Sequence, residues 1–189
     1  MRKEVLEIVE KIEAGKVVLY PTDTIWGLGC DPFNQDAVDR IFSIKKRAQD
    51  QPLILLVSDL NMLKSLVYKM HPKLENILYF NERPLTIIFK KARKTFAKGI
   101  TSQSGSIALR IVQEPFCKEV ISALGKPLVS TSANVSKSPF PKSFDEISSD
   151  ILENVDYISQ YHGQVGEDPQ PSLIAEYSAK QKELIFLRN

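Results

Sequence analysis

The sequence contains few of the residues that most often carry covalent or metal chemistry. It has two cysteines, which do not form a C-x-x-C pair, and two histidines that lie far apart. This composition excludes a disulfide framework and the common zinc-site spacings. The chain also lacks the signatures of a P-loop, a dinucleotide-binding glycine loop, a zinc protease and a serine hydrolase. Any chemistry should therefore depend on positioning and charge stabilisation rather than on a covalent nucleophile.

Long apolar runs are missing too. No window approaches the roughly 20 apolar residues that a membrane-spanning helix needs. The N-terminal stretch "MRKEVLEIVEKIEAG" mixes charged and apolar residues at helical spacing, which a signal peptide does not. We therefore expect a cytoplasmic protein with no membrane segment. The length of 189 residues and the hydrophobic fraction of 43% predict one domain over residues 1–189.

Charge is distributed unevenly along the chain. The formal net charge is only +2, yet residues 40–110 hold fourteen basic and four acidic residues. The densest basic run is "KKARKTFAK" over residues 90–98. Such a run is usually a solvated surface, and the alternative is a surface that binds a phosphate-bearing ligand or an RNA backbone.

Hydrophobic periodicity predicts strands and helices that alternate over most of the chain. Helices are expected over residues 5–12, 34–44, 58–67, 72–80, 114–125 and 143–155. Strands are expected over residues 16–20, 52–57, 85–90, 106–112, 126–134, 156–160, 171–177 and 183–189. The alternation favours an α/β fold with a twisted, open, mixed β-sheet and flanking helices. The expected loops include "YPTDTIWGLGCDP" at residues 20–32 and the stretches at 136–143 and 160–171.

Polar residues gather where several of these elements end. "PTDT" follows the first strand, "KKR" ends the second helix, "STSAN" follows a later strand, and "LRN" ends the last one. Ligands of open α/β sheets bind at the carboxyl ends of strands, so these stretches are the candidate binding segments. Each one alone also has an ordinary structural explanation, as a turn, a cap or a basic helix end.

Arg110 is the most informative single residue. It lies inside the strand pattern "SIALRIV", where alternation places it on the same face as Ser106 and Ala108. An arginine on a largely apolar strand needs a carboxylate or a phosphate as partner. The residues alone leave open whether that partner is a ligand or a structural salt bridge.

Five stretches, taken in order, resemble the YrdC-type family, the threonylcarbamoyladenylate synthases of tRNA modification. They are "YPTDTIWGLGCD", "KKRAQDQPLILL", "SIALRI", "STSAN" and "PSLIAE" with the terminal "LRN". The resemblance spans nearly the whole chain and implies a twisted mixed sheet with a concave basic cleft. It implies that L-threonine, bicarbonate or CO2, and ATP give L-threonylcarbamoyl-AMP and pyrophosphate, with Mg2+ assisting. Downstream proteins would then transfer the threonylcarbamoyl group to an adenosine next to the anticodon, so that tRNA or double-stranded RNA is a candidate partner.

The resemblance also implies roles for individual residues. The catalytic pair is Lys45 and Arg47, and no residue is implied as a protein ligand of a metal. The residues expected to bind threonine are Thr22, Thr24, Arg110, Ser130 and Ser172. The residues expected to bind ATP are Lys45, Arg47, Gln51, Ser106, Ser132, Asn134 and Arg188.

The chain departs from the family pattern at several positions. Lys137 stands where the family often has glycine after the S-A-N loop, which is residues 132–134 in this chain. Phe140 lies near a position at which the family often has serine. Leu56 ends a strand at which many longer members carry histidine. Ligand contacts from these three positions are therefore not transferred. The residues leave two roles open for Asp23, which are to cap its loop and to help bind the cation.

Two other functions stay open on the residues alone. A non-catalytic RNA-binding maturation factor would use the basic cleft and the run at residues 90–98 to bind an RNA backbone. A related carbamoyl-handling enzyme would resemble the YrdC-like domain of hydrogenase maturation proteins. The zinc-finger and acylphosphatase parts that usually accompany that domain are missing from this sequence.

Overall fold

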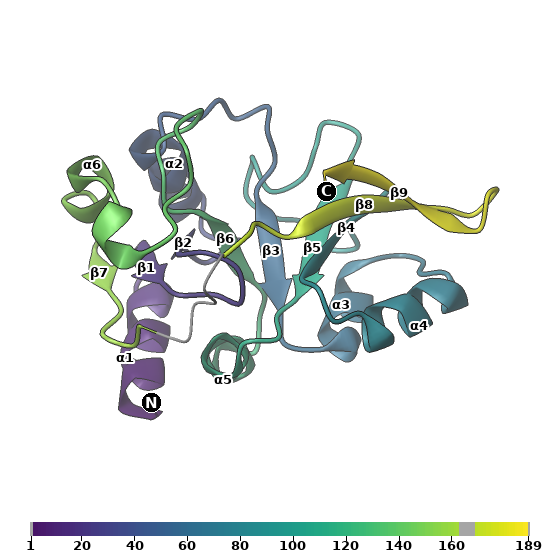
Figure 1. The fold of residues 1–189 in the computed structure, drawn as a ribbon, viewed down its shortest axis with the longest axis horizontal. Helices are drawn as coiled ribbons and strands as arrows, with labels where there is room; N and C mark the ends of the chain where they lie inside the picture. The colour runs from purple at the N-terminus through teal and green to yellow at the C-terminus, as the bar shows by residue number, and fades with distance from the viewer. Residues whose placement is uncertain (1, 163–168, 189) are drawn as a thin grey trace.

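The computed structural model of the chain describes residues 2–162 and 169–188. Their strands form one nine-stranded mixed sheet in the order β7-β1-β2-β6-β3-β5-β4-β8-β9 (Figure 1). The strands are β1 (Val18–Tyr20), β2 (Gly27–Gly29), β3 (Ile54–Val57), β4 (Leu85–Phe89), β5 (Ile107–Ile111), β6 (Leu128–Ser132), β7 (Tyr157–Ile158), β8 (Leu173–Ser178) and β9 (Glu183–Arg188). The predicted mixed sheet is confirmed, as is the terminal hairpin of β8 and β9. Residues 163–168 of the loop predicted over 160–171, and residue 189, lie outside the described residues.

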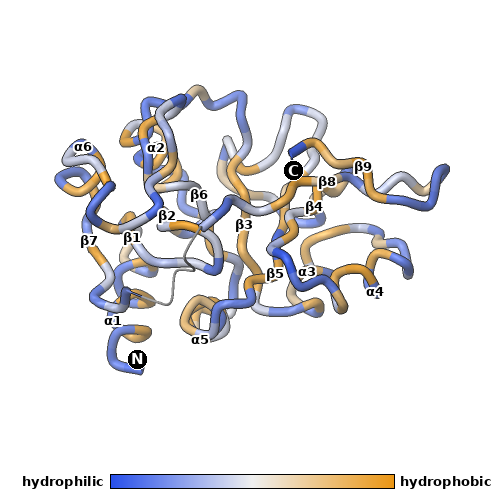
Figure 2. The backbone as a smooth tube through the Cα atoms, in the orientation of Figure 1, coloured by the Kyte–Doolittle hydropathy of each residue, from blue (hydrophilic) through white to orange (hydrophobic). Residues whose placement is uncertain are grey.

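Helices cover both faces of this sheet. On one face, α1 (Arg2–Glu13) and α5 (Pro115–Leu124) pack against each other and share a core with the strands. On the other face lie α2 (Gln35–Ile44), α3 (Leu60–Leu66) and α4 (Pro72–Phe80), over the larger core. The central strand β3 is apolar along its whole length (Figure 2), whereas its neighbour β5 carries Arg110 among apolar residues. Within the described residues, none of the helices has the length and apolar content needed to cross a membrane.

The alternation of side chains along each strand decides which core a residue enters. On β3, Leu55 and Val57 belong to the core under α2, α3 and α4, whereas Leu56 belongs to the core under α1 and α5. Side chains two residues apart share a face, so Ile54 points to the same side as Leu56. Because α1 and α5 cover only part of that side, Ile54 lines a pocket instead of a core.

Capping residues set several helix ends where the sequence predicts them. Asn34 Oδ1 accepts a hydrogen bond from the backbone nitrogen of Ala37 at 3.1 Å and so caps α2. Asp59 caps α3, because its Oδ1 accepts a hydrogen bond from the backbone nitrogen of Met62 at 2.9 Å. Gly125 follows α5 with a φ of 61°, as expected of a glycine that ends a helix.

The prediction of one helix over residues 143–155 is wrong. The segment instead forms a short 3-10 helix, η1 (Phe144–Glu146), and a short α6 (Ser149–Leu152). Between them, Ile147 and Ser148 adopt extended conformations. The side chain of Ile147 is buried in the core, and Ser148 takes the conformation of an N-cap, a position that serine favours over helix interiors.

The prediction that residues 27–29 belong to a loop is also wrong. Gly27–Gly29 is strand β2, and it pairs antiparallel with both β1 and β6. Glycine is depleted in strands, which is why the sequence pattern indicates a loop. At Gly29 there is no room for a side chain, because a Cβ there would lie 2.6 Å from Tyr20 Cε1 and 3.0 Å from Val129 O.

We expect Gly29→Ala to destabilise the protein, because the new methyl group would overlap the Tyr20 ring and the Val129 carbonyl. Overpacking of this kind costs about 1–3 kcal/mol. The free energy of unfolding in urea should fall by that amount without a change in the dependence on urea concentration. A variant as stable as the parent would show that β1 and β6 can move away from β2 at no cost.

Candidate active site

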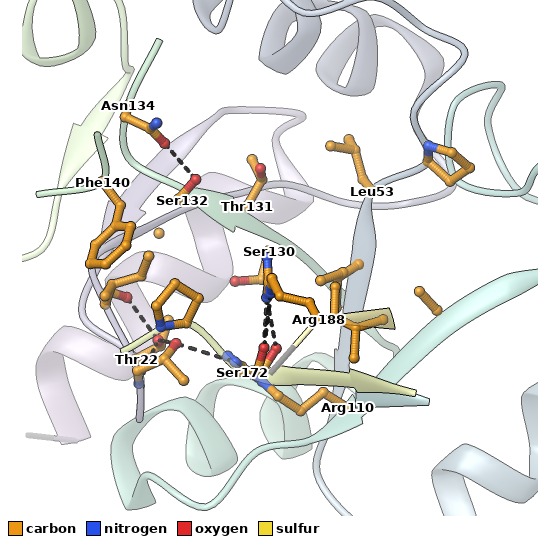
Figure 3. Close-up of a pocket in the computed structure, with 18 of the residues that line it drawn as sticks. Thr22, Leu53, Arg110, Ser130, Thr131, Ser132, Asn134, Phe140, Ser172 and Arg188 are labelled. Atoms are coloured by element: carbon orange, nitrogen blue, oxygen red, sulfur yellow. Dashed lines mark hydrogen bonds between the residues drawn. The ribbon is translucent and has the colours of Figure 1, made fainter. Parts of the chain in front are cut away.

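A pocket of about 490 Å³ lies on the part of the sheet that α1 and α5 leave uncovered (Figure 3). Its floor is a row of residues that face one another across neighbouring strands. The registers pair Ser130 with Ile54, Ile54 with Ala108, Ala108 with Ile88, and Ile88 with Glu176. The row therefore crosses β6, β3, β5, β4 and β8. In Figure 3, Thr22 and Arg110 lie on one side of the pocket, and Ser132 and Asn134 lie on the other.

The connection between β1 and β2, residues 21–26, forms one wall. Thr22 Oγ1 donates to the carbonyl of Ile25 at 2.8 Å, so its single proton is used there. Thr24 Oγ1 lies 2.8 Å from Thr22 Oγ1 and must donate to it. Thr24 Oγ1 in turn accepts from Arg110 NH1 at 3.2 Å, which leaves it one further acceptor position toward the pocket.

Arg110 does have a structural ion-pair partner. Its NH2 lies 3.1 Å from Asp23 Oδ1, and the two side chains are 6% and 7% exposed. The angle of this contact is outside hydrogen-bond geometry, so Asp23 Oδ1 accepts no hydrogen bond from the described residues. Arg110 Nε is also buried without a hydrogen-bond partner among them. The ion pair therefore leaves part of the guanidinium group available to a ligand.

Lys45 and Arg47 diverge at the end of α2. Lys46 between them has a φ of 49°, and its side chain points outward to Asp150, with 2.9 Å between Nζ and Oδ2. Arg47 lines the pocket and donates from Nε to the carbonyl of Gln51 at 3.2 Å and from NH2 to that of Pro52 at 3.3 Å. Burial, opposed by the nearby Asp50 carboxylate, lowers the pKa of Arg47 below its ordinary value.

Lys45 is almost completely buried, at 1% exposure, and does not line the pocket. Its ammonium group donates to the backbone carbonyls of Ser132 and Asn134, the latter at 2.7 Å. The backbone carbonyl of Lys45 accepts from Ser136 N at 2.8 Å. Lys45 therefore holds the S-A-N loop, residues 132–134, from behind. Burial, and secondly the charge of Arg47, lower the pKa of Lys45 to about 7.

The S-A-N loop is fixed by a chain of hydrogen bonds. Ser132 Oγ donates to Asn134 Oδ1, and Asn134 Nδ2 donates to the carbonyl of Ser138 at 2.6 Å. Ala133 N donates to the carbonyl of Trp26 at 2.9 Å and so ties the loop to the wall formed by residues 21–26. Lys137 beyond the loop has a φ of 71°, a left-handed conformation that glycine adopts without strain. This conformation explains in physical terms why glycine suits that position.

The terminal hairpin supplies the remaining wall. Arg188 donates from Nε and NH2 to the carbonyl of Ser172, at 3.1 Å and 2.7 Å. Ser172 Oγ lies 2.8 Å from Thr86 Oγ1 on β4. Although Arg188 is the second-last residue, these bonds hold it at the pocket. Burial, and secondly the charge of Arg110, lower its pKa.

The pocket brings together most of the residues that the sequence singles out. Those that line it are Thr22, Thr24, Arg47, Ser106, Arg110, Ser130, Ser132, Asn134, Ser172 and Arg188. Lys45 lies behind the S-A-N loop, and Gln51 is exposed outside the lining. Of the departures, Phe140 lines the pocket, whereas Leu56 is buried in the core under α1 and α5.

Sequence reasoning missed several lining residues, among them Ser102, Ser138 and Glu176. Glu176 was detectable in principle, because alternation along β8 places it on the face of Ser172 and Ile174. Three arginines and one glutamate are the charged residues of the described lining. The prediction that the whole concave face is basic stays a prediction.

Comparisons with known proteins agree with this geometry. The model of the Sua5/YciO/YrdC family, described as "Telomere recombination", matches residues 10–189. A threonylcarbamoyl-AMP synthase of Pseudoalteromonas translucida (strain TAC 125) is 37% identical over 164 residues, which are 86% of this chain and 87% of that protein. A threonylcarbamoyl-AMP synthase of Vibrio vulnificus (strain YJ016) is 30% identical over 178 residues, which are 93% of this chain and 94% of that protein.

Solved structures show the same fold. Sua5 of P. abyssi, in a crystal structure complexed with L-threonine, matches the whole chain with a TM-score of 0.84 and 25% sequence identity. The present chain spans 54% of the length of that Sua5 chain. The family model and the two bacterial relatives each cover most of the sequence. This chain therefore belongs to the Sua5/YciO/YrdC family.

Proposed function

We propose that this protein is a threonylcarbamoyl-AMP synthase, an enzyme that makes L-threonylcarbamoyl-AMP and pyrophosphate from L-threonine, bicarbonate or CO2, and ATP. The observation that carries the proposal is the partly unsatisfied Arg110 beside Thr24 in a pocket that Arg47 and the S-A-N loop also line. The two bacterial relatives with this name support it. The protein acts, in this proposal, as one domain over residues 1–189 and in the cytoplasm.

The side of the pocket with Arg110 suits an amino acid. Arg110 lines this side and donates one N–H to Thr24, so it keeps further N–H groups, and a carboxylate is the natural acceptor for a guanidinium group. Thr24 Oγ1 has one acceptor position left, which suits an N–H of the amine. Trp26 lines the same wall and offers an apolar surface to the methyl group of threonine.

The opposite side suits the phosphates of ATP. Arg47 uses some of its five N–H groups on two carbonyls and keeps the others for an anion. The hydroxyl and amide groups of Ser132 and Asn134 lie on the same side. Among the described residues of the lining, Glu176 is the single carboxylate. These residues fit a Mg2+ ion held mainly by the ATP phosphates, a common arrangement in which the ion neutralises phosphate charge.

The proposed reaction has two bond-forming steps. The amine of threonine becomes an N-carboxylate in one of two ways: it attacks the carbon of CO2 and loses a proton, or it attacks the carbon of bicarbonate and a water molecule leaves. An oxygen of this carbamate then attacks the α-phosphorus of ATP, and the bond to pyrophosphate breaks. Arg47 stabilises negative charge on the phosphates, while Arg110 and Thr24 hold threonine so that its carbamate reaches the phosphorus.

The product is a mixed anhydride, and we propose that downstream proteins transfer its threonylcarbamoyl group to tRNA. The alternative of a non-catalytic RNA-binding factor rests on the exposed basic residues Lys90, Lys91, Arg93 and Lys94. A pure RNA-binding protein would show a steep salt dependence of RNA affinity and no thermal stabilisation by ATP with threonine. That comparison separates the two functions.

Pyrophosphate release should require every substrate. We expect the purified protein to release pyrophosphate with ATP, Mg2+, threonine and bicarbonate, and to stop when any one is left out. The assay measures pyrophosphate over time in four omission reactions. Release that continues without threonine would overturn the proposed function.

Arg47→Ala should lower kcat/KM for ATP by about 100- to 1000-fold, the scale of losing one donor that stabilises charge in a transition state. The KM for threonine should change little, because Arg47 donates to the carbonyl of Pro52, next to Leu53, and Figure 3 shows Leu53 across the pocket from Arg110. Lys94→Ala is the matched control, since it removes an exposed positive charge outside the pocket. Equal activity of Arg47→Ala and the parent protein would show that Arg47 does not contact the phosphates.

Lys45 should take up a proton when ATP binds. Its pKa of about 7 leaves it mostly neutral at pH 8, and nearby phosphates favour the ammonium form and so raise the pKa. Between pH 7 and the raised value, the complex therefore holds more protons than the free protein. Calorimetric titrations of ATP at pH 8 in two buffers with different ionisation enthalpies measure this uptake. It should disappear in Lys45→Met, and uptake that is unchanged in that variant would contradict the assignment.

A further inference from the structure

Asp23 lies in the wall formed by residues 21–26, yet it is not part of the pocket lining. Its side chain is 7% exposed and stands behind Arg110, which does line the pocket. The residues alone leave its role open between capping the loop and binding the cation, and the proposed reaction does not use it. A buried carboxylate needs compensation, so its position requires an explanation.

Two contacts fix the carboxylate. Oδ2 accepts a hydrogen bond from the backbone nitrogen of Gln113 at 3.2 Å, just after the end of β5. Oδ1 lies 3.1 Å from NH2 of Arg110, which is on β5 itself. Asp23 is therefore anchored to the backbone that follows the strand and attracts the guanidinium group carried by that strand.

The arrangement is more than a stabilising ion pair. A pair optimised for its own stability would align two parallel hydrogen bonds between guanidinium and carboxylate. Here Asp23 Oδ1 accepts no hydrogen bond from the described residues, and Arg110 Nε donates none to them. Buried ion pairs contribute weakly to stability in any case, because desolvation opposes the attraction. The geometry suits a carboxylate that orients the arginine and leaves other N–H groups of the guanidinium group to another acceptor.

The third contact completes the orientation. Arg110 NH1 donates to Thr24 Oγ1 at 3.2 Å, so Asp23 and Thr24, which flank one peptide bond, hold the two terminal nitrogens of one guanidinium group. An arginine side chain has several rotatable bonds, and two such contacts restrict it to one orientation. The guanidinium group then keeps further N–H groups that no described residue accepts, on a side chain that lines the pocket.

We propose that Asp23 is a positioning residue for the recognition of the substrate carboxylate, and that it acts through Arg110. The proposal rests on the proposed function and adds to it the group that orients the arginine before threonine binds. Asp23 does not touch the substrate. When Asp23 carries no charge, the guanidinium group of Arg110 turns away from the orientation that receives the substrate carboxylate. Threonine then binds more weakly, while ATP binds as before.

The test compares two variants with the parent protein in the pyrophosphate assay. Asp23→Asn keeps the shape of the side chain and removes its charge. Asp31→Asn is the matched control, because Asp31 also forms an ion pair, 2.5 Å from Lys126 Nζ, and lies outside the pocket lining. We expect Asp23→Asn to raise the KM for threonine about 10- to 100-fold, since small misplacements of a binding group have effects up to that scale. The KM for ATP should stay unchanged, and Asp31→Asn should alter neither KM.

A double-mutant cycle shows whether Asp23 acts through Arg110. In an Arg110→Lys background, Asp23→Asn should add little to the KM for threonine, because the group it orients is already gone. The proposal would be overturned if the effects of the two substitutions on the KM for threonine multiplied. It would also be overturned if Asp23→Asn raised the KM for ATP and the KM for threonine by the same factor. If that variant does not fold, Asp23→Glu keeps the charge, displaces it by one methylene group and should raise the KM for threonine in the same selective way.

Failure of the inference and failure of the proposed function give different results. If the parent protein releases no threonine-dependent pyrophosphate, the proposed function fails and the inference fails with it. If the parent protein is active and the threonine KM of Asp23→Asn equals that of Asp31→Asn, only the inference is overturned.

Discussion

The sheet has more surface on one face than its two helices can cover, and the pocket depends on that difference. On β3, β5 and β6, residues under α1 and α5 belong to a core, and residues two or four positions away on the same face line the pocket. The core residues are Leu56 on β3, Val112 just after β5, and Leu128 on β6. The pocket residues on the same strands are Ile54, then Arg110 and Ala108, and Ser130. One strand therefore serves folding at one end and binding at the other, so the floor of the site is as rigid as the sheet.

The half-covered face of the sheet also explains which partners the charged side chains of the site need. An arginine on a strand with a half-covered face loses water on folding and needs a partner, which Asp23 supplies only in part. At the other side, Lys45 replaces its water shell with the carbonyls of the S-A-N loop. Arg47, half-buried and held by two carbonyls, is a neighbouring cation that does line the pocket. The protein thus separates a cation that supports a loop from one that can meet a ligand.

The sequence predicts the elements that have a clear period and the site residues that lie on them. Arg110, Ser106 and Ala108 share a face because the alternation of β5 is regular, and the structure places all three in the pocket lining. The prediction fails where contacts between distant segments override local preference. Gly27–Gly29 is a strand because β1 and β6 enclose it, and residues 143–155 break because Ile147 is drawn into the core. The side-chain positions of Lys45 and Asp23 are set by partners about 90 positions away, which no local pattern shows.

The burial of Lys45 has a consequence for self-modification. A neutral amine is a nucleophile, and a lysine with a pKa of about 7 has far more of that form at neutral pH than a lysine on the surface. The product proposed for this pocket is an activated carbamoyl donor, so an accessible amine of this kind would become an acceptor of its carbamoyl group. The loop that Lys45 supports also covers it, because its Nζ points at the carbonyls of Ser132 and Asn134 behind the pocket wall. The same contact that shapes the site thereby also keeps this amine out of the pocket lining.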